Sequence, residues 1–368
     1  MGRKLADLAE LANYSVLSQG TANNFFALEA STSGTAGFTF EAILSKGFSD
    51  TSIYCLKNSI GSYAIRSWPD CDASHEKIDF WRSVNVAWRR NAPFGTHSRG
   101  PFPTIHSWSL ALADPSIVIP FAEKLWTLSE WVNGHPIRRG DTQFDLIHHL
   151  ASVLASIHKA TLSATDESTG RLEHYRQQSP SIYDRLQFLS SLDSRILALV
   201  NHSDFFHESQ LTDQVINSLS SLLNKLESWR QFLDQCTARN RECHWIVRDL
   251  WYENVLVDDS NHFSSIVDLG AARFDWPGLD FVRLFGSLIG VEDNLWETAY
   301  AVYTNEHPGH GIDSLDECRL LGRLSCGLSI AQWVRWITDA RFNTNDIVVC
   351  QRLRSRITEL CDQFLSVS

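Results

Sequence analysis

Short runs of alternating apolar and polar residues occupy the first third of the chain. Alternation with a period of two is typical of half-buried strands, and glycine-containing stretches between such runs are typical of turns. The runs lie at residues 40–44, 52–56, 62–66, 116–120 and 125–131. Between the third and fourth runs, residues 74–90 place apolar side chains at helical spacing. This part of the chain therefore predicts a small sheet accompanied by one helix.

The rest of the chain has apolar residues three or four positions apart. Leu146, Leu150 and Leu154 fall on one face of a predicted helix. Near the C-terminus, Trp333 and Trp336 continue an apolar helical stripe, so we expect them in the core. The other expected elements are helices at 183–200 and 209–238 and a strand-rich island at 244–269.

These two patterns predict an α+β fold with two lobes. A chain of 368 residues is too long for one small core, which agrees with that division. We expect an N-terminal segment at 1–37, a small β-rich N-lobe at 38–132 and a larger, mainly helical C-lobe at 133–368.

Composition and charge disfavour several classes of protein. Hydrophobic residues make up 43% and charged residues 20%, as in ordinary globular proteins. The net charge of -11 and the lack of a basic run disfavour nucleic-acid binding. No apolar stretch approaches the roughly 20 residues that span a membrane, and Asp7, Glu10 and Asn13 interrupt any signal-peptide core. We therefore expect a cytoplasmic protein without nucleic-acid or membrane partners; the oligomeric state stays open.

Eight cysteines are spread along the chain, and none forms a C-x-x-C pair. The chain is too large for a mini-domain held together by disulfides. We therefore expect reduced, mostly buried thiols and no zinc site.

The strand-rich island contains the residues best suited to chemistry. Asp249 and Asn254 are five positions apart, and Asp268 follows an apolar segment and precedes Gly270 by two. Phosphoryl transfer depends on positioning and charge neutralisation more than on covalent help from the protein. A carboxylate near the acceptor hydroxyl takes its proton, while amide and carboxylate oxygens suit Mg²⁺. The order D-x-x-x-x-N, apolar strand, D-x-G supplies these groups.

This pattern resembles the aminoglycoside phosphotransferase and choline-kinase-like family. The loop with Arg248, Asp249 and Asn254 is similar to its catalytic loop. The segment around Asp268 is similar to its metal-binding segment, and residues 275–281 are similar to the loop that follows. The resemblance extends weakly over most of the chain, and it implies a bilobal protein-kinase-like fold.

The resemblance also implies chemistry. ATP would be the phosphate donor, Mg²⁺ the metal and a small molecule the acceptor. Asp249 would be the catalytic base, with Arg248 beside it. Asn254 and Asp268 would be the Mg²⁺ ligands. Asp280 would be structural, either bracing the catalytic loop or capping the next helix.

Two positions of the catalytic loop depart from the family pattern. Val247 stands where many relatives carry His, a packing and hydrogen-bonding residue whose loss does not remove the chemistry. Arg248 stands where small-molecule kinases commonly carry Gly, and an Arg here is typical of protein kinases instead.

The resemblance assigns further roles in the N-lobe. Gly47, Phe48 and Ser49 resemble the turn that covers the phosphates, where glycine lets backbone N–H groups approach them; a plain hairpin loop is the alternative. Arg66 stands where the family usually has a Lys that binds the α- and β-phosphates, so the charge remains but becomes a planar fork. Glu76, which opens the next helix, is the expected partner of Arg66, with a solvated side chain as the alternative.

The strand-like run at 125–131 leads into a segment that resembles the adenine-binding hinge. Backbone groups make the contacts in such a hinge, which places Glu130 and Val132 beside the nucleotide. We interpret His158 as a histidine at a helix end, stabilised by the helix dipole, rather than as a catalytic group.

Four functions remain open from the sequence. The favoured one is an active small-molecule kinase. Arg66 and the missing His at 247 favour instead a nucleotide-binding pseudokinase that serves as a scaffold or regulator. A protein kinase is supported by Arg248-Asp249 alone, because only about a dozen residues separate Asp268 from Asp280. A helical interaction protein leaves the motif unexplained. The sequence does not identify the acceptor. An amine-bearing acceptor could bind to acidic residues of the C-lobe; the alternative is that these side chains are simply solvated. They are Glu292, Asp293, Glu297 and Asp339.

Overall fold

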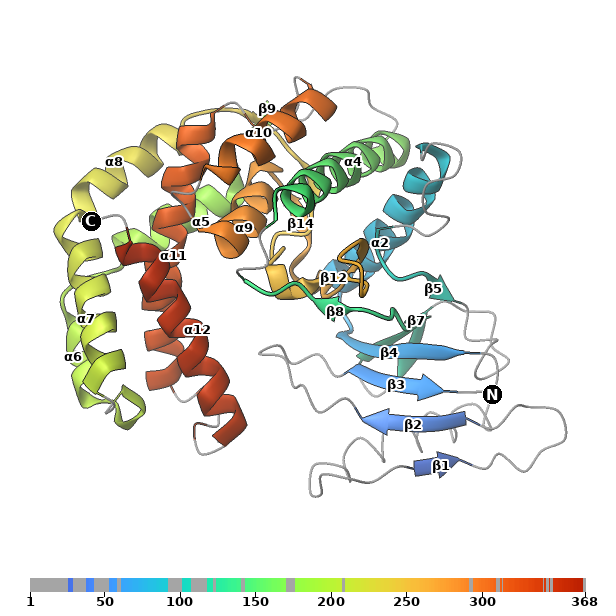
Figure 1. The fold of residues 1–368 in the computed structure, drawn as a ribbon, viewed down its shortest axis with the longest axis horizontal. Coiled ribbons are helices and arrows are strands. Elements are labelled where there is room, and N and C mark those ends of the chain that lie inside the picture. Colours follow the sequence, from blue (N-terminus) through green and yellow to red (C-terminus); the bar gives the residue numbers. More distant parts are fainter. Residues whose placement is uncertain are drawn as a thin grey trace, which may run out of the picture. The chain divides into compact units, whose positions relative to one another are not determined.

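The structure is a computed structural model of the whole chain (Figure 1). Some residues are not described. The described residues are 26–28, 38–42, 53–57, 61–91, 101–106, 118–121, 124–139, 143–169, 176–206, 209–290, 294–308, 312, 314–339, 341, 344 and 347–366.

The chain divides into two compact units. The first comprises Met1–Pro136 and Asn254–Ala272, and the second comprises Ile137–Glu253 and Arg273–Ser368. The first border lies close to the expected one, after residue 132. The difference is the segment 254–272, which we expected in the second lobe and which belongs with the first unit.

The larger sheet of the first unit is antiparallel (Figure 1). Its strand order is β1-β2-β3-β4-β7-β5, and β6 pairs with β7. Each of the five expected runs overlaps one of these strands, whereas β1 and β5 were not expected. The elements are β1 (Phe26–Leu28), β2 (Phe38–Ala42), β3 (Ile53–Lys57), β4 (Ser62–Pro69), β5 (Ile105–His106), β6 (Val118–Phe121), β7 (Lys124–Glu130) and helix α2 (Asp72–Asn91).

Helix α2 packs against this sheet through aromatic side chains. The rings of Trp68 on β4 and Trp81 on α2 have centroids 6.3 Å apart. Trp81 Nε1 donates to the Pro103 carbonyl at 2.7 Å. One turn further along α2, the buried Asn85 accepts from the Phe102 amide at 3.3 Å and donates to the Phe102 carbonyl at 3.1 Å. These directional bonds fix the orientation of the helix about its axis.

A second, smaller sheet in the first unit joins segments that are distant in the sequence. Its order is β13-β12-β8, and both pairs are antiparallel. Gly134, just before β8, has φ 146°, and a Cβ there would lie 2.8 Å from the Val257 carbonyl oxygen, so the close approach requires glycine. The Ile266 amide donates to the Pro101 carbonyl at 2.8 Å. The elements are β8 (His135–Pro136), β12 (Val255–Val257), β13 (Phe263–Ile266) and the 3₁₀ turn η4 (Leu269–Ala271).

The second unit is mainly helical (Figure 1). Its helices are α4 (Phe144–Thr169), α5 (Pro180–Ser190), α6 (Arg195–His202), α7 (Ser209–Asn224), α8 (Leu226–Thr237), α9 (Gly278–Ile289), α10 (Leu295–Glu306), α11 (Leu315–Thr338) and α12 (Ile347–Leu365). Its short elements are the strand pair β9 (Arg176–Gln177) and β10 (Arg241–Glu242), the strand pair β11 (His244–Ile246) and β14 (Arg273–Asp275), the 3₁₀ turn η2 (Asp204–Phe206) and, at the border, η3 (Tyr252–Asn254). Within the described ranges, no helix combines the length and apolarity needed to cross a bilayer.

Two of the expected helices are each divided in two. The helix expected at 183–200 breaks between α5 and α6, where the Asp193 carboxylate accepts from the Arg195 amide at 2.9 Å. Such side-chain bonds to the backbone compete with helix continuation. The helix expected at 209–238 breaks at Lys225, between α7 and α8. Periodicity misses both breaks because the apolar spacing resumes after each of them.

The expectation that Trp333 and Trp336 lie in the core is wrong. Both are partly exposed, and their rings contact each other edge to face with centroids 5.3 Å apart. The buried residues of this part of α11 are Val334 and Ile337. The buried stripe therefore runs one position further round the helix than the tryptophans suggest.

All eight cysteines lie in the described part of the chain, and none of them is joined to another there. Six are buried, as expected for thiols that serve as small apolar side chains.

Candidate active site

The loop after β11 carries Arg248 and Asp249 and is held by one buried carboxylate. The amides of Val247 and Arg248 donate to the two oxygens of Asp280 at 2.8 and 2.6 Å. Asp280 lies in the first turn of α9 and is fully buried. Of the two roles expected for Asp280, bracing the catalytic loop is confirmed.

Arg248 adopts a left-handed backbone conformation, with φ 69°. For a residue with a Cβ this conformation costs on the order of 1–2 kcal/mol, which explains why glycine suits this position. The bonds from Asp280 hold the loop in place despite the strain. The chain therefore keeps an arginine side chain where glycine is energetically easier, and that guanidinium lies 4.0 Å from the Asp184 carboxylate.

Arg283 positions the candidate base, Asp249. Its Nε and Nη2 both donate to Asp249 Oδ1, at 3.1 and 3.0 Å. The guanidinium also stacks over the Trp251 ring, 4.2 Å from its centroid. Asp249 remains accessible, with 48% of its side chain exposed. The motif did not reveal Arg283, although it follows Asp280 by three positions on α9 and so lies on the same helix face.

A buried polar cluster supports the loop from behind. His158 Nδ1 lies 2.6 Å from the Tyr303 hydroxyl, and its Nε2 lies 3.4 Å from Asp280. Burial lowers the pKa of His158 to about 3, so the ring is neutral and can accept from Tyr303 while donating to Asp280. The interpretation of His158 as a helix-end residue is wrong, because α4 continues to Thr169 and the dipole would favour a charged ring.

In the first unit, strand pairing brings the two expected metal ligands close in register. The Val267 amide donates to the Asn254 carbonyl at 2.9 Å, and Val255 pairs with Ile266 on the adjoining strands. Asp268 follows directly, in a left-handed conformation with φ 63° and with 43% of its side chain exposed. An amide oxygen and an accessible carboxylate are hard donors that fit Mg²⁺.

Arg66, on β4 of the first unit, pairs with Asp268 rather than with Glu76. Its Nη1 lies 3.6 Å from Asp268 Oδ1, and its side chain is 9% exposed. Burial lowers the pKa of Arg66, and the Asp268 carboxylate partly opposes that shift. Glu76 is exposed on α2, so the expected Arg66–Glu76 pair is not found. The sequence did not predict the partner of Arg66 because that partner depends on which residues of α2 face the sheet, and the sequence pattern does not specify this.

The α2 side chain that reaches the metal segment is a lysine. Lys77 Nζ donates to the Gly270 carbonyl at 2.6 Å. Lys77 is adjacent to Glu76 but points to the other side of the helix, since neighbouring residues are about 100° apart around the axis. A cation from α2 and a cation from β4 therefore both contact the D-x-G segment.

The structure describes only some of the other residues expected to contact the nucleotide. Gly47, Phe48 and Ser49 lie outside the described residues. Glu130 ends β7, and its amide donates to the Thr104 carbonyl at 2.9 Å. Val132 follows the strand and is partly exposed.

These observations define the chemistry of each unit separately. In the first unit, Asp268 pairs with Arg66, Lys77 contacts Gly270, and the Asn254 backbone bonds to Val267. The second presents a carboxylate, Asp249, on a braced loop. Such a set of groups is typical of kinase-like phosphotransferases.

Comparison with known proteins agrees with this class. Residues 44–311 match the model of the phosphotransferase enzyme family, and the chain belongs to that family. This confirms the expected kinship, the expected fold class and the expectation of an enzyme that transfers phosphate.

Two solved structures share the fold at low identity. An aminoglycoside phosphotransferase from Alicyclobacillus acidocaldarius is 14% identical, with a TM-score of 0.51, over 85% of this chain and 88% of that one. A spectinomycin phosphotransferase in complex with ADP and spectinomycin is 12% identical, with a TM-score of 0.52, over 89% of this chain and 92% of that one. No curated protein matches the sequence.

Proposed function

We propose that this phosphotransferase moves the γ-phosphate of ATP, with Mg²⁺, to a hydroxyl group of a small molecule. The observation that carries the proposal is that strand pairing brings Asn254 next to Val267, one residue before Asp268, whose carboxylate lies beside Arg66. The spectinomycin phosphotransferase of the same fold was solved with ADP, which agrees with a nucleotide donor.

Each residue has a role in the proposed reaction. Asp249 accepts the proton of the acceptor hydroxyl, while a bond forms between that oxygen and the γ-phosphorus. The bond from the γ-phosphorus to the bridging oxygen breaks, and ADP leaves. Arg283 holds the Asp249 carboxylate in place, and Asp280 holds the loop.

Asn254 and Asp268 would hold the metal in this scheme. When bound, Mg²⁺ would neutralise charge on the β- and γ-phosphates. Arg66 would contribute a further positive charge to the phosphates, as a fork rather than a point charge. Glu130 and Val132 would provide backbone contacts to adenine, and Gly47, Phe48 and Ser49 would cover the phosphates.

The first test is binding of MgATP measured by calorimetry. We expect Mg²⁺-dependent binding to the parent protein and at least tenfold weaker binding to Asp268→Asn. Asp259→Asn is the matched control, because Asp259 is an exposed residue of the turn between β12 and β13 and should bind like the parent. No binding to the parent would overturn the proposal.

The second test separates an active enzyme from the pseudokinase alternative. Asp249→Asn should keep MgATP affinity and lose ATP turnover, because Asp249 acts on the acceptor and not on the nucleotide. Turnover that is equal in Asp249→Asn and the parent would exclude Asp249 as the base. Binding without turnover in the parent, across a broad acceptor panel, would favour the pseudokinase.

A further inference from the structure

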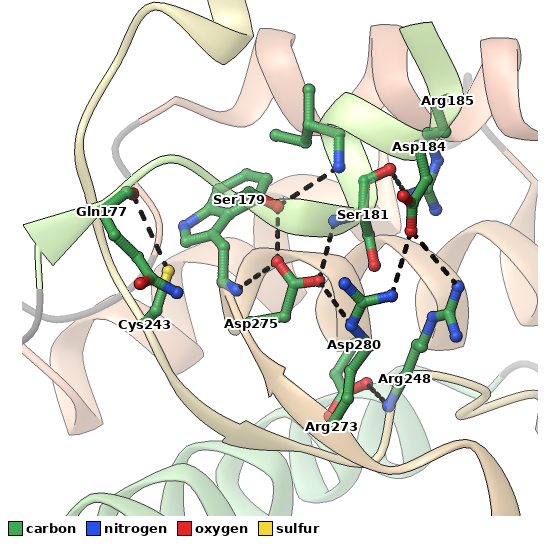
Figure 2. A network of polar contacts seen from close by, with 12 residues as sticks. Gln177, Ser179, Ser181, Asp184, Arg185, Cys243, Arg248, Arg273, Asp275 and Asp280 are labelled. Carbon is green, nitrogen blue, oxygen red and sulfur yellow. Dashed lines mark hydrogen bonds and ion pairs between the residues drawn. The ribbon is translucent and has the colours of Figure 1, made fainter. Parts of the chain in front are cut away.

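Arginine side chains gather around the candidate base in the second unit. Figure 2 shows the guanidinium groups of Arg248 and Arg273 both reaching Asp184 on α5. Arg273 Nη1 donates to Asp184 at 3.0 Å, and Arg248 lies 4.0 Å away. Arg283 completes the group by its bonds to Asp249. These elements, α5, β14, α9 and the catalytic loop, thus direct cations to one region.

A fourth arginine, Arg185, lies in the same region without a carboxylate partner at ion-pair distance among the described residues. Its Nε donates to Ser325 Oγ at 3.2 Å and its Nη1 to the Ser181 carbonyl at 3.0 Å. Burial, with the nearby charges of Arg248 and Arg283, lowers the pKa of Arg185 to about 10, although the carboxylates of Asp275 and Asp184 oppose the shift.

Two of the four carboxyl groups in this region are committed to the fold. Asp275 is fully buried and accepts from Ser179 Oγ at 2.5 Å and from the Ser181 amide at 2.9 Å (Figure 2). Asp280 is also fully buried, and it accepts from the amides of Val247 and Arg248. The exposed carboxylates are Asp184 and Asp249, at 56% and 48% of their side chains, and they face the cations Arg185, Arg248, Arg273 and Arg283.

Arg248 and Arg273 are accessible to a ligand, while Arg185 is more deeply set and has Nε and Nη1 bonded to the protein. Arg248 has 43% of its side chain exposed and Arg273 29%, and Asp184 is 56% exposed. An ion pair this exposed is weak, so a better-matched anion can compete with Asp184. The planar fork of arginine fits carboxylate and phosphate oxygens through two parallel bonds.

We propose that the acceptor is a hydroxy compound with an oxyanion, either a carboxylate or a phosphate ester, bound by Arg185, Arg248 and Arg273. This inference rests on the proposed function, since it names the substrate class of the same reaction. It replaces the amine-bearing acceptor considered from the sequence. Of the acidic residues then in view, Glu297 lies 3.6 Å from Arg319 on α11 and so already has a cationic partner.

Arg248 supports the proposal independently of the other arginines. Its backbone is left-handed, so its side chain is retained at an energetic cost where glycine would be easier. The only ion pair that the described residues give this side chain is the weak one with Asp184, at 4.0 Å, and a ligand contact explains better why a cation is kept at a strained position. Arg248→Gly therefore removes the side chain without disturbing the backbone that Asp280 holds.

The test measures anion binding directly, apart from turnover. Calorimetry at constant ionic strength compares inorganic phosphate and glycerate on the parent, Arg185→Met and Arg248→Gly. Each substitution should weaken binding by about tenfold or more, as expected for a hydrogen-bonded charge. Arg195→Met is the control: it removes the same charge from α6 of the same unit, where the Arg195 side chain is 89% exposed, and should change nothing.

Turnover then tests the acceptor class with matched three-carbon compounds. ATP turnover is followed with glycerol, 3-amino-1,2-propanediol, glycerate and glycerol 3-phosphate. We expect one of the two anionic compounds to give the largest stimulation, and the comparison between them separates a carboxylate from a phosphate site. Arg248→Gly should raise the KM of that acceptor about tenfold and leave the KM of MgATP unchanged.

Failure of the anionic acceptor and failure of the proposed kinase activity give different results in these experiments. Preference for the amine or the neutral compound overturns the anionic acceptor but leaves the kinase intact. Equal anion binding by the parent, Arg185→Met and Arg248→Gly also overturns it. Absence of MgATP binding overturns the kinase, while arginine-dependent anion binding would still show the site.

Discussion

Asp249 receives two hydrogen bonds from Arg283 on the same oxygen, Oδ1. This pair of bonds restricts the rotation of the carboxylate. The same guanidinium and that of Arg356 both stack on Trp251, at 4.2 and 3.3 Å from the ring centroid. The candidate base is therefore positioned by a group that belongs to no recognised motif of the loop.

Replacing Arg283 should affect chemistry more than binding. Arg283→Lys keeps the charge but offers a single donor group, so Asp249 gains rotational freedom. We expect kcat to fall about tenfold and the KM of MgATP to stay within about twofold, as measured by steady-state ATP turnover.

Arg356→Lys is the matched control for this prediction. Arg356 shares the Trp251 stack, and its ion pairs are with Glu253 and Glu359 rather than with Asp249. Equal losses in both variants would mean that Arg283 acts only through packing on Trp251.

The sequence identified Asp249, Asn254 and Asp268 as candidates because they lie at a recognisable spacing within one short island, and their roles stay predictions. Sequence reasoning failed where long-range contacts decide. Arg283 and Lys77 were missed, because their importance comes from contacts with residues 34 and 193 positions away. No local pattern specifies which helix face will meet them.

At the scale of elements, α2 contributes a cation to the metal segment instead of the expected carboxylate. The Lys77 bond to the Gly270 carbonyl fixes the turn that follows Asp268. It joins the helix directly to the D-x-G segment, without Arg66 as an intermediate. The position of α2 and the position of the candidate metal ligand, Asp268, are thus coupled.

Loss of this bond should weaken metal-dependent nucleotide binding. We expect Lys77→Met to lower the affinity for MgATP about tenfold and to raise the Mg²⁺ concentration that half-saturates binding. Calorimetry at several Mg²⁺ concentrations checks this. Glu76→Gln, one residue away and exposed, should bind like the parent; a comparable loss there would restore Glu76 as the functional partner.

The packing of α4, α9 and β11 buries three titratable groups with shifted pKa values. Burial lowers the pKa of His158 and of His244 to about 3, from 6.5. Burial raises the pKa of Asp280 to about 7, from 3.8. Between pH 6.5 and 4, unfolding therefore takes up two protons on the histidines and releases one from Asp280.

This net uptake of one proton sets the acid sensitivity of the fold. Between about pH 5.5 and 4.5, where the unfolded histidines are fully protonated, the free energy of unfolding should fall by about 1.4 kcal/mol for each pH unit. His158→Gln removes one of the two histidine protons, so that contribution should disappear. Urea denaturation of both proteins at pH 5.5 and 4.5 measures the difference, in which other groups cancel. Parallel pH dependences would show that His158 is not neutral in the fold.

At the scale of the whole molecule, the two units are interleaved in sequence. The chain leaves the first unit after Pro136, returns at Asn254 and leaves again after Ala272. The positions of most strands were predictable from the sequence, but their order in the sheets was not. In the small sheet, for example, β8 and β12 pair across about 120 residues. Periodicity identifies strands but not their partners.

This division predicts where each ligand protects the backbone. Hydrogen exchange should slow on β4, β7 and 254–272 when MgADP is added, because the proposed nucleotide contacts lie in the first unit. An anionic acceptor should slow exchange at 179–185 and at the catalytic loop. Mass-spectrometric peptide mapping reads both regions at once, and protection in the reverse pattern would contradict the assignment of ligands to units.

The return of residues 254–272 to the first unit has a consequence for synthesis. The small sheet lacks two of its three strands until β12 and β13 have left the ribosome, after about three quarters of the chain. At roughly 5–20 residues per second, the ribosome needs from about 14 to 54 seconds to reach that point. The strands β1 to β7 of the larger sheet can pair among themselves during that interval, but β8 lacks its neighbour β12 and the Pro101 carbonyl lacks the Ile266 amide. Slowing translation before codon 254 should therefore lower the soluble yield more than slowing it after codon 272.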